Sequence, residues 1–150
     1  MKINFTLNGC AVKVDVGPTD TLTDVLRQKL GILSVKKGCE TGDCGACAVL
    51  VDGKLINSCI TLAPTIVNKD IITAEGLMIN GEMDIIQKRI AELHGTQCGF
   101  CTPGMIIAIK ALLSCNPHPS ESEIRRAISG NLCRCTGYQK IVEAVQSITE

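Results

Sequence analysis

The 150-residue sequence has almost no aromatic side chains, with two Phe, one Tyr and no Trp. Apolar residues still make up 45% of the chain, so the core that they build must be aliphatic. Net charge is also missing, because 15 basic residues balance 15 acidic residues and no run of one sign stands out. Nothing in this charge pattern indicates a nucleic-acid or lipid surface, and we expect neither as a partner.

Long apolar runs are absent as well. The first seven residues alternate apolar and polar side chains and lack the continuous apolar segment of a secretion signal. The most apolar stretch, residues 105–113, is interrupted by Lys110 and is too short to cross a bilayer. We therefore expect a soluble, cytoplasmic protein that does not enter a membrane.

Cysteine, in contrast, is abundant, with ten residues. In the reducing cytoplasm, thiols act as metal ligands or redox groups more often than they form disulfides. Eight of the ten fall into two quartets, one spaced C-x4-C-x2-C with a fourth cysteine after eleven residues, the other a C-x2-C pair followed by a C-x-C pair. The quartets are Cys39, Cys44, Cys47 and Cys59, then Cys98, Cys101, Cys133 and Cys135.

The spacing of the first quartet is that of the plant-type ligands of a two-iron, two-sulfide cluster. Such a loop must turn tightly to bring backbone N–H groups toward sulfur, and Gly38, Gly42 and Gly45 suit that need. In the second quartet, Arg134 stands between two cysteines and would offset the negative charge of a cluster. The sequence therefore predicts two iron–sulfur sites and single-electron chemistry.

Other interpretations of the cysteines explain less of the pattern. A structural zinc site usually pairs two C-x2-C units, which neither quartet does. Thioredoxin-type chemistry at Cys98 and Cys101 leaves the other six cysteines unexplained, and buried thiol packing explains no spacing. A Rieske centre needs a pair of histidine ligands, and the two histidines, His94 and His118, are not paired in this way.

The remaining thiols, Cys10 and Cys115, have no partner at ligand spacing and are interpreted as structural.

Residues 1–76 are expected to form a small α+β sheet domain. Alternating apolar residues flank Asn8-Gly9, and a second pair of strands flanks Asp52-Gly53, which predicts two hairpins. Residues 20–30 have helical spacing, with Thr19 or Asp20 as the cap, and residues 70–73 resemble a further strand. Gly31 would stop the helix.

Residues 77–150 are expected to form a compact four-helix domain, after a linker at residues 76–82. Apolar stripes predict helices near residues 83–93, 104–113, 124–128 and 141–148. Thr102-Pro103 is interpreted as the start of the second of these helices, and Ser120-x-x-Glu123 as a capping box that opens the third.

Three motifs together closely resemble the iron–sulfur subunit of molybdenum hydroxylases, the xanthine dehydrogenase and aldehyde oxidoreductase family. They are Gly38-Cys39-x4-Cys44-Gly45-Ala46-Cys47, Gln97-Cys98-Gly99-Phe100-Cys101-Thr102-Pro103-Gly104-Met105 and Gly130-Asn131-Leu132-Cys133-Arg134-Cys135-Thr136-Gly137-Tyr138. The resemblance covers nearly the whole chain. It implies an N-terminal β-grasp ferredoxin-like domain and a C-terminal four-helix domain, each with one 2Fe-2S cluster.

The resemblance also implies partners, namely a large subunit with molybdopterin and a medium subunit with FAD. The second quartet would lie nearer molybdenum and the first nearer the flavin, and Gln97 would hydrogen-bond the pterin. The chain itself shows no catalytic residues and no substrate site. Its implied function is to relay single electrons for the hydroxylation of a purine or another N-heterocycle. Aldehyde, carbon monoxide and aromatic acyl-CoA enzymes of the same family, or a free ferredoxin-like carrier, are the alternatives.

Overall fold

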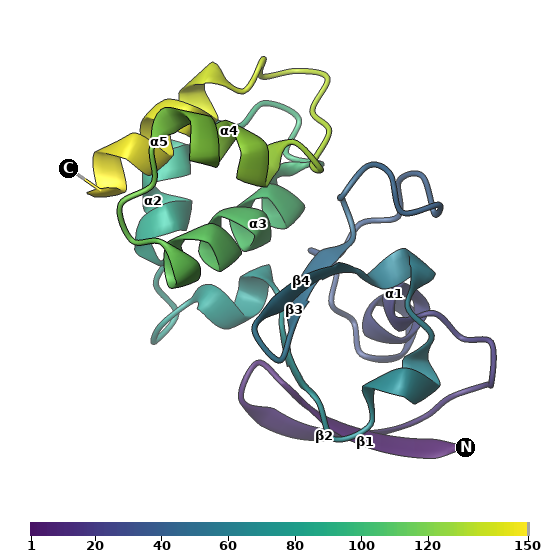
Figure 1. Cartoon of the computed structure of the whole chain (residues 1–150). Coiled ribbons are helices and arrows are strands. Elements are labelled where there is room, and N and C mark those ends of the chain that lie inside the picture. The colour runs from purple at the N-terminus through teal and green to yellow at the C-terminus, as the bar shows by residue number, and fades with distance from the viewer. Residues whose placement is uncertain (150) are drawn as a thin grey trace.

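The structure is a computed structural model that describes residues 1–149. The fold is mixed α+β, with a five-stranded sheet beside a group of helices (Figure 1). The described strands lie in the first half of the chain and the longest helices in the second. Within the described residues, no helix combines the length and the apolarity that crossing a membrane requires.

The chain begins with an antiparallel hairpin of β1 (Lys2–Leu7) and β2 (Cys10–Asp15). Asn8 and Gly9 form its turn with positive φ angles of 51° and 80°. Both residue types accept this left-handed conformation at low cost. The hairpin predicted at Asn8-Gly9 is confirmed.

A second antiparallel hairpin joins β3 (Ala48–Val51) to β4 (Lys54–Asn57), as predicted. The last strand, β5 (Asp70–Ile72), inserts between the two hairpins and gives the strand order β2-β1-β5-β3-β4. It pairs parallel with β1 and antiparallel with β3. Strand β3 directly follows the first three cysteines. It lies on the side of the sheet that is next to the helices (Figure 1).

Residues 20–30 form a helix, but not a uniform one. Helix α1 (Leu22–Asp24) passes directly into a π-helical turn (Val25–Lys29), in which the Leu30 N–H binds the Val25 carbonyl at 3.1 Å. Gly31 then leaves the helix with φ of 70°. The predicted location and end are correct, whereas the wider helical turn is a feature that apolar spacing does not encode.

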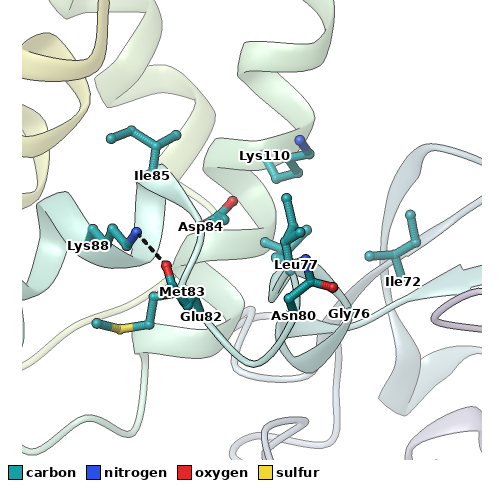
Figure 2. Close-up of a pocket in the computed structure, with 11 residues that line it drawn as sticks. Ile72, Gly76, Leu77, Asn80, Glu82, Met83, Asp84, Ile85, Lys88 and Lys110 are labelled. Atoms are coloured by element: carbon teal, nitrogen blue, oxygen red, sulfur yellow. Dashed lines mark ion pairs between the residues drawn. The ribbon is translucent and has the colours of Figure 1, made fainter.

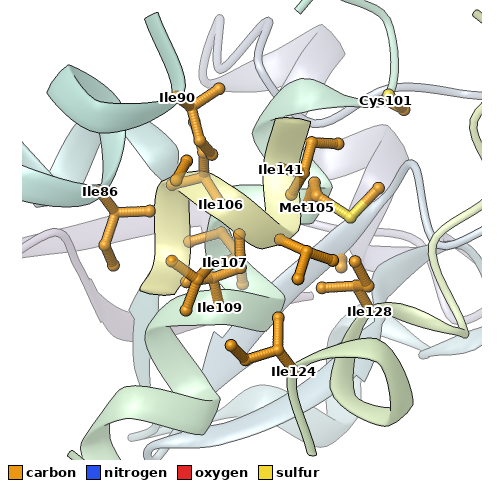
Figure 3. Packing of buried hydrophobic residues seen from close by; sticks show 14 of the residues in the cluster. Ile86, Ile90, Cys101, Met105, Ile106, Ile107, Ile109, Ile124, Ile128 and Ile141 are labelled. Atoms are coloured by element: carbon orange, nitrogen blue, oxygen red, sulfur yellow. The ribbon is translucent and has the colours of Figure 1, made fainter. Parts of the chain in front are cut away.

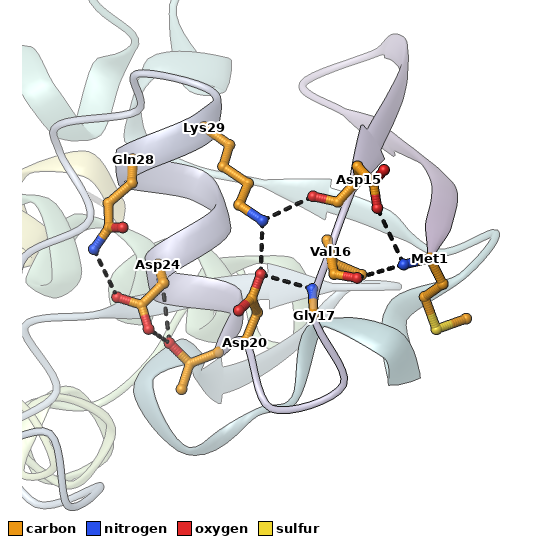
Figure 4. Close-up of polar contacts among 9 residues, drawn as sticks. Met1, Asp15, Val16, Gly17, Asp20, Asp24, Gln28 and Lys29 are labelled. Atoms are coloured by element: carbon orange, nitrogen blue, oxygen red, sulfur yellow. Dashed lines mark hydrogen bonds and ion pairs between the residues drawn. The ribbon is translucent and has the colours of Figure 1, made fainter.

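The predicted cap of this helix is wrong by one or two residues, because Thr21 caps it instead of Thr19 or Asp20. The Asp20 carboxylate already accepts from the Gly17 N–H at 2.9 Å and from the Lys29 ammonium at 2.7 Å (Figure 4). The Lys29 contact, followed by the Gly17 bond, lowers the pKa of Asp20. Asp20 thus ties the helix to the end of β2.

Four longer helices make up the second half, as their apolar stripes predicted. They are α2 (Ile85–Glu92), α3 (Thr102–Cys115), α4 (Glu121–Ile128) and α5 (Gln139–Thr149).

The predicted capping box of α4 is confirmed, since the Ser120 hydroxyl accepts from the Glu123 N–H and the Glu123 carboxylate accepts from the Ser120 N–H. The predicted cap of α3 is wrong. Cys101 occupies the N-cap position and Thr102 is already helical, while Pro103 lies in the first turn as expected. The Thr102 hydroxyl instead pairs with the hydroxyl of Thr96 at 2.9 Å.

Helix α3 is the centre of the helical core, which is aliphatic as the composition required (Figure 3). Its isoleucines are buried in one cluster with apolar residues of α2, α4 and α5, and each fully buried side chain of this kind contributes about 1.5–3 kcal/mol. The same core includes Ala48 and Leu50 of β3. The sheet half and the helical half therefore share one packed interface.

The segment predicted as a linker, residues 76–82, is more ordered than expected. A 3₁₀ turn (Ala74–Leu77) brings Leu77 into the helical core, and Asn80 and Gly81 form a tight turn closed by pairing of Ile79 with Glu82.

Beside this segment, a cavity of about 860 Å³ opens between β5, α2 and α3 (Figure 2). Its lining residues include Lys110 and the Lys88–Glu82 ion pair, at 3.5 Å, but no cysteine.

Candidate iron–sulfur sites

The first cysteine site is a loop of residues 38–47 that leads into β3. The loop reverses direction through three left-handed residues, Glu40, Gly42 and Gly45, with φ angles of 57°, 87° and 71°. These turns point successive backbone N–H groups inward, as in the anion-binding nests of other proteins. The glycines predicted for tight turns are confirmed at Gly42 and Gly45, whereas Gly38 does not have a positive φ and instead leaves room for the Cys44 sulfur, which a Cβ there would approach to 2.7 Å.

The Cys39 sulfur is the main acceptor in this loop. It accepts from the N–H groups of Thr41, Asp43 and Cys44 at 3.2–3.4 Å, and the Cys44 sulfur accepts from the Cys39 N–H at 3.4 Å. The hydroxyl and N–H of Thr41, with the N–H groups of Cys44 and Asp43, lower the pKa of Cys39 to about 5. The loop thus stabilises sulfur in its anionic form, the form that binds a metal.

Cys47 and Cys59 form a second pair at the same site, at the entry to β3 and in a 3₁₀ turn after β4. Both are buried, and the Cys59 N–H lies 3.5 Å from the Cys47 sulfur. Burial and the neighbouring Cys47 raise the pKa of Cys59 to about 12. A second thiolate here requires a positive charge in the site, which a metal centre supplies.

The second cysteine site gathers residues from three helix boundaries. Cys101 precedes α3, Cys98 lies in the loop after α2, and Cys133 and Cys135 lie between α4 and α5. The thiol of Cys101 is within hydrogen-bonding reach of Cys133, and that of Cys98 within reach of Cys135. Helix termini thus bring together all four cysteines of the second quartet.

Burial differs within this site. Cys101 is buried, and burial together with the neighbouring Cys133 raises its pKa to about 12. Burial is the largest single influence and acts to raise the pKa of Cys133, but hydrogen bonds from Thr136, Cys135 and Cys101 together lower the pKa overall. Cys98 and Cys135 are exposed. One side of the site is therefore enclosed by α3 and the other side is open.

Two side chains that the sequence did not single out support Cys133. The Thr136 hydroxyl lies 3.0 Å from the Cys133 sulfur, and the phenol oxygen of Tyr138 accepts from the Cys133 N–H at 2.8 Å. Both residues belong to the third motif and follow Cys133 and Cys135 closely in the sequence. This nearness was the only feature of the sequence that could have identified them. Arg134, predicted to offset cluster charge, is exposed.

Gln97 lies on the open side of the second site. Its side chain is exposed, and its amide nitrogen donates to the Cys135 carbonyl at 3.0 Å. The residue is therefore held against a cysteine of the site.

The two sites adjoin one another. The Leu132 N–H, next to Cys133, donates to the Cys44 carbonyl at 2.9 Å. The buried Asn131 amide donates to the Gly45 carbonyl at 3.0 Å. Sequence reasoning missed this contact, because it joins residues 86 positions apart.

The donor set fits 2Fe-2S clusters. Each site presents four sulfurs in two pairs, and a two-iron cluster takes two thiolates on each iron. In residues 1–149, no group of three or more His, Cys, Asp or Glu side chains is arranged to hold a metal ion directly, so the fit rests on the two sulfur pairs at each site. The pairs are Cys39 with Cys44, Cys47 with Cys59, Cys98 with Cys135, and Cys101 with Cys133.

The remaining two cysteines and the two histidines are not among these pairs. Cys10 and Cys115 are both exposed, so they do not pack in the core as structural thiols would. His94 is exposed, and the His118 ring is paired with the Thr149 carbonyl at 3.3 Å.

The family comparisons agree with the geometry. Residues 5–74 match the family described as 2Fe-2S iron-sulfur cluster binding domain, and residues 73–146 match the [2Fe-2S] binding domain family.

Among curated proteins, the nicotinate dehydrogenase small FeS subunit of Eubacterium barkeri is 47% identical, with 99% of this chain and 94% of that protein covered. The xanthine dehydrogenase iron-sulfur-binding subunit of Escherichia coli is also 47% identical, with 95% of this chain and 91% of that protein covered.

Among solved structures, a chain of quinoline 2-oxidoreductase from Pseudomonas putida 86 is 41% identical, with a TM-score of 0.97 over 99% of this chain and 93% of that one. Three findings support the same assignment. They are the two adjoining four-cysteine sites, the two matching cluster-binding domains, and the near-complete coverage by small FeS subunits. This chain belongs to the iron–sulfur subunits of the molybdenum hydroxylase family.

Proposed function

We propose that this chain is the electron-transfer subunit of a molybdenum hydroxylase, with its eight paired cysteines as the ligands of two 2Fe-2S clusters. The observation that carries the proposal is the direct contact between the sites, in which the Leu132 N–H binds the Cys44 carbonyl at 2.9 Å. Two separate storage sites would have no need to adjoin. When bound, each cluster supplies a carrier for one electron.

The chain's own residues adjust the two sites. N–H groups of Thr41, Asp43 and Cys44 donate to the Cys39 sulfur and so favour the more negatively charged state of that site. At the other site, Thr136 does the same for Cys133, and the N-terminus of α3 places its positive end beside Cys101. Burial of Cys47, Cys59 and Cys101 keeps water from one side of each site.

The partners in this proposal are a molybdopterin-binding large subunit and an FAD-binding medium subunit. Cys98 and Cys135 are exposed, and the same two loops carry the apolar side chains of Phe100 and Leu132, which are 46% and 56% exposed. We propose that this face docks against the molybdenum subunit, with Gln97 hydrogen-bonded to the pterin, and that the first site lies toward the flavin.

The proposed substrate is a purine or another N-heterocycle. The relatives named above are called nicotinate and xanthine dehydrogenases, and the solved structure is a quinoline oxidoreductase. An aldehyde is the second candidate, because an aldehyde oxidoreductase of Megalodesulfovibrio gigas is 42% identical, with 94% of this chain and 16% of that protein covered. In either case the substrate would bind to the large subunit, and this chain would pass electrons onward.

We further propose that residues 1–76 form a β-grasp domain and residues 77–150 a four-helix domain, in a cytoplasmic complex. The strand order β2-β1-β5-β3-β4 around α1 supports the first assignment. The four helices α2 to α5 around one aliphatic core support the second.

Purification of the native complex followed by cofactor analysis tests the function. We expect four irons and four sulfides per chain, since two 2Fe-2S clusters contain about that number, together with molybdopterin and FAD on copurifying chains. Electron paramagnetic resonance (EPR) of the reduced complex should resolve two distinct signals. Zinc in place of iron would contradict the cluster assignment, whereas a chain recovered alone with two clusters would favour a free carrier.

A further inference from the structure

The Gly45 joint, defined here as Gly45, Gly104, Gly130 and Asn131, is the point where the sheet half meets the helical half between the two cysteine sites. A Cβ atom on Gly45 would lie 2.3 Å from the Gly130 carbonyl oxygen, and one on Gly104 would lie 2.4 Å from the Gly45 carbonyl oxygen. Both distances are far below van der Waals contact. Three backbone segments therefore meet here with no room for a side chain.

Asn131 is the one polar side chain of the joint. It is 3% exposed, and its amide donates to the Gly45 carbonyl at 3.0 Å. Its backbone N–H is bonded to the Ile128 carbonyl at 2.9 Å, so the residue is fixed to the end of α4. A buried amide held in this way rigidifies its surroundings and favours one arrangement.

The joint lies directly between proposed ligands of different clusters. Gly45 follows Cys44 in the first site, and Asn131 precedes Leu132 and Cys133 in the second. Phe100, between Cys98 and Cys101, also reaches the first loop, where its ring would come within 3.7 Å of a Cβ on Gly38. Any movement at Gly45 therefore changes the placement of one site relative to the other.

We propose that Asn131 is a positioning residue that holds the two cluster sites at a fixed separation by anchoring the Gly45 carbonyl. The inference rests on the proposed function, because it presupposes a cluster at each site. Asn131 touches neither set of sulfurs in the described contacts and acts through the Gly45 backbone. Loss of the Asn131 amide should change the separation between the two sites and leave each site intact.

The test uses the full chain with both clusters reduced and compares three variants. Asn131→Leu keeps a similar volume without the donor, and Asn131→Ser shortens the side chain so that it no longer reaches. Asn57→Leu is the matched control, since the Asn57 amide also donates to a carbonyl of the first loop, that of Gly42 at 2.9 Å, but from the sheet half. Iron analysis and EPR measure each site, and spin–spin splitting in the EPR spectrum measures their separation.

We expect Asn131→Leu and Asn131→Ser to keep both signals at full intensity while the splitting shrinks and its distribution widens. Asn57→Leu should keep the wild-type splitting. If Asn131→Leu does not fold, Asn131→Ser decides the question. Wild-type splitting in the Asn131 variants, or equal shrinkage in Asn57→Leu, would overturn the inference. Fewer than two clusters in the wild-type chain would instead overturn the proposed function.

Discussion

The two cysteine sites are built in different ways. The first takes three of its cysteines from the loop of residues 38–47, and backbone N–H groups donate to its sulfurs, three of them to that of Cys39. The second collects its cysteines from three helix ends, and side chains of Thr136 and Tyr138 support it. The first site therefore depends on backbone conformation, which glycine permits, and the second depends on particular side chains and on helix packing.

The largest loss of stability should come from a substitution of Gly45, where the backbone loop of the first site contacts the helix ends of the second. Gly45→Ala adds a Cβ at φ of 71° and 2.3 Å from the Gly130 oxygen, so it combines backbone strain with overpacking. We expect a loss of about 3 kcal/mol or more, and a fall in Tm of about 6–12 °C. Thermal unfolding followed by circular dichroism, together with iron content, measures it.

The matched control is Gly9→Ala, which has the same kind of backbone strain at φ of 80° but nothing within 4 Å of the new Cβ. It should lose less, about 1–2 kcal/mol, because only the backbone strain remains. Equal losses at both glycines would mean that the joint is not closely packed.

Removal of one ligand should affect one site only. Cys133→Ser should abolish one of the two reduced EPR signals and remove about half of the iron, and Cys59→Ser should abolish the other signal. Cys10→Ser and Cys115→Ser, at exposed thiols outside both quartets, should keep both signals. If Cys133→Ser leaves both signals unchanged, the second quartet is assigned wrongly.

A smaller effect is expected from the hydroxyl beside Cys133. Thr136→Val removes a hydrogen bond to sulfur at 3.0 Å that favours the reduced, more negative state. A bond worth about 0.5–1.5 kcal/mol corresponds to a fall in the midpoint potential of the second cluster of about 20–60 mV. Redox titration followed by EPR should show the fall at one signal.

Thr102→Val is the comparison for that experiment. Thr102 also adjoins a proposed ligand, Cys101, but its hydroxyl pairs with Thr96. The midpoint potential of this variant should stay at the wild-type value. A similar fall in both variants would attribute the effect to general polarity near the site.

The smallest effect should come from Tyr138→Phe, which leaves the Cys133 N–H without its acceptor at 2.8 Å. The position is half-buried, so water partly replaces the phenol. We expect a loss of about 0.5–1.5 kcal/mol in the free energy of unfolding with both signals retained. Chemical denaturation measures it, and a loss of the second signal would show that Tyr138 is needed for the cluster itself.

Features of local sequence could be predicted well. Asn8-Gly9 forms the expected hairpin turn, and Ser120 with Glu123 forms the expected capping box, because each depends on neighbouring residues in the chain. The left-handed conformations of Gly42 and Gly45 followed from the same reasoning. Cysteine spacing likewise predicted which thiols lie together, while their role as cluster ligands stays a prediction.

Features that depend on tertiary packing could not be predicted. The contact of Asn131 with Gly45 spans 86 positions, and a buried amide is not distinguished from a loop amide by its neighbours in the sequence. Threonine is a common helix cap, but the Thr102 hydroxyl pairs with Thr96 and leaves the cap position of α3 to Cys101. The order of residues 76–82 was missed because Leu77 is held by the helical core and not by local propensity.

The open side of the second site has a consequence for handling the protein. Two of its four cysteines, Cys98 and Cys135, are exposed, whereas the four cysteines of the first site are all buried or half-buried. In a chain separated from its partners, dissolved oxygen reaches the second site first, and exposed thiolates are the first sulfurs to oxidise. Aerobic preparations should therefore lose the second cluster before the first. Anaerobic purification should preserve both clusters.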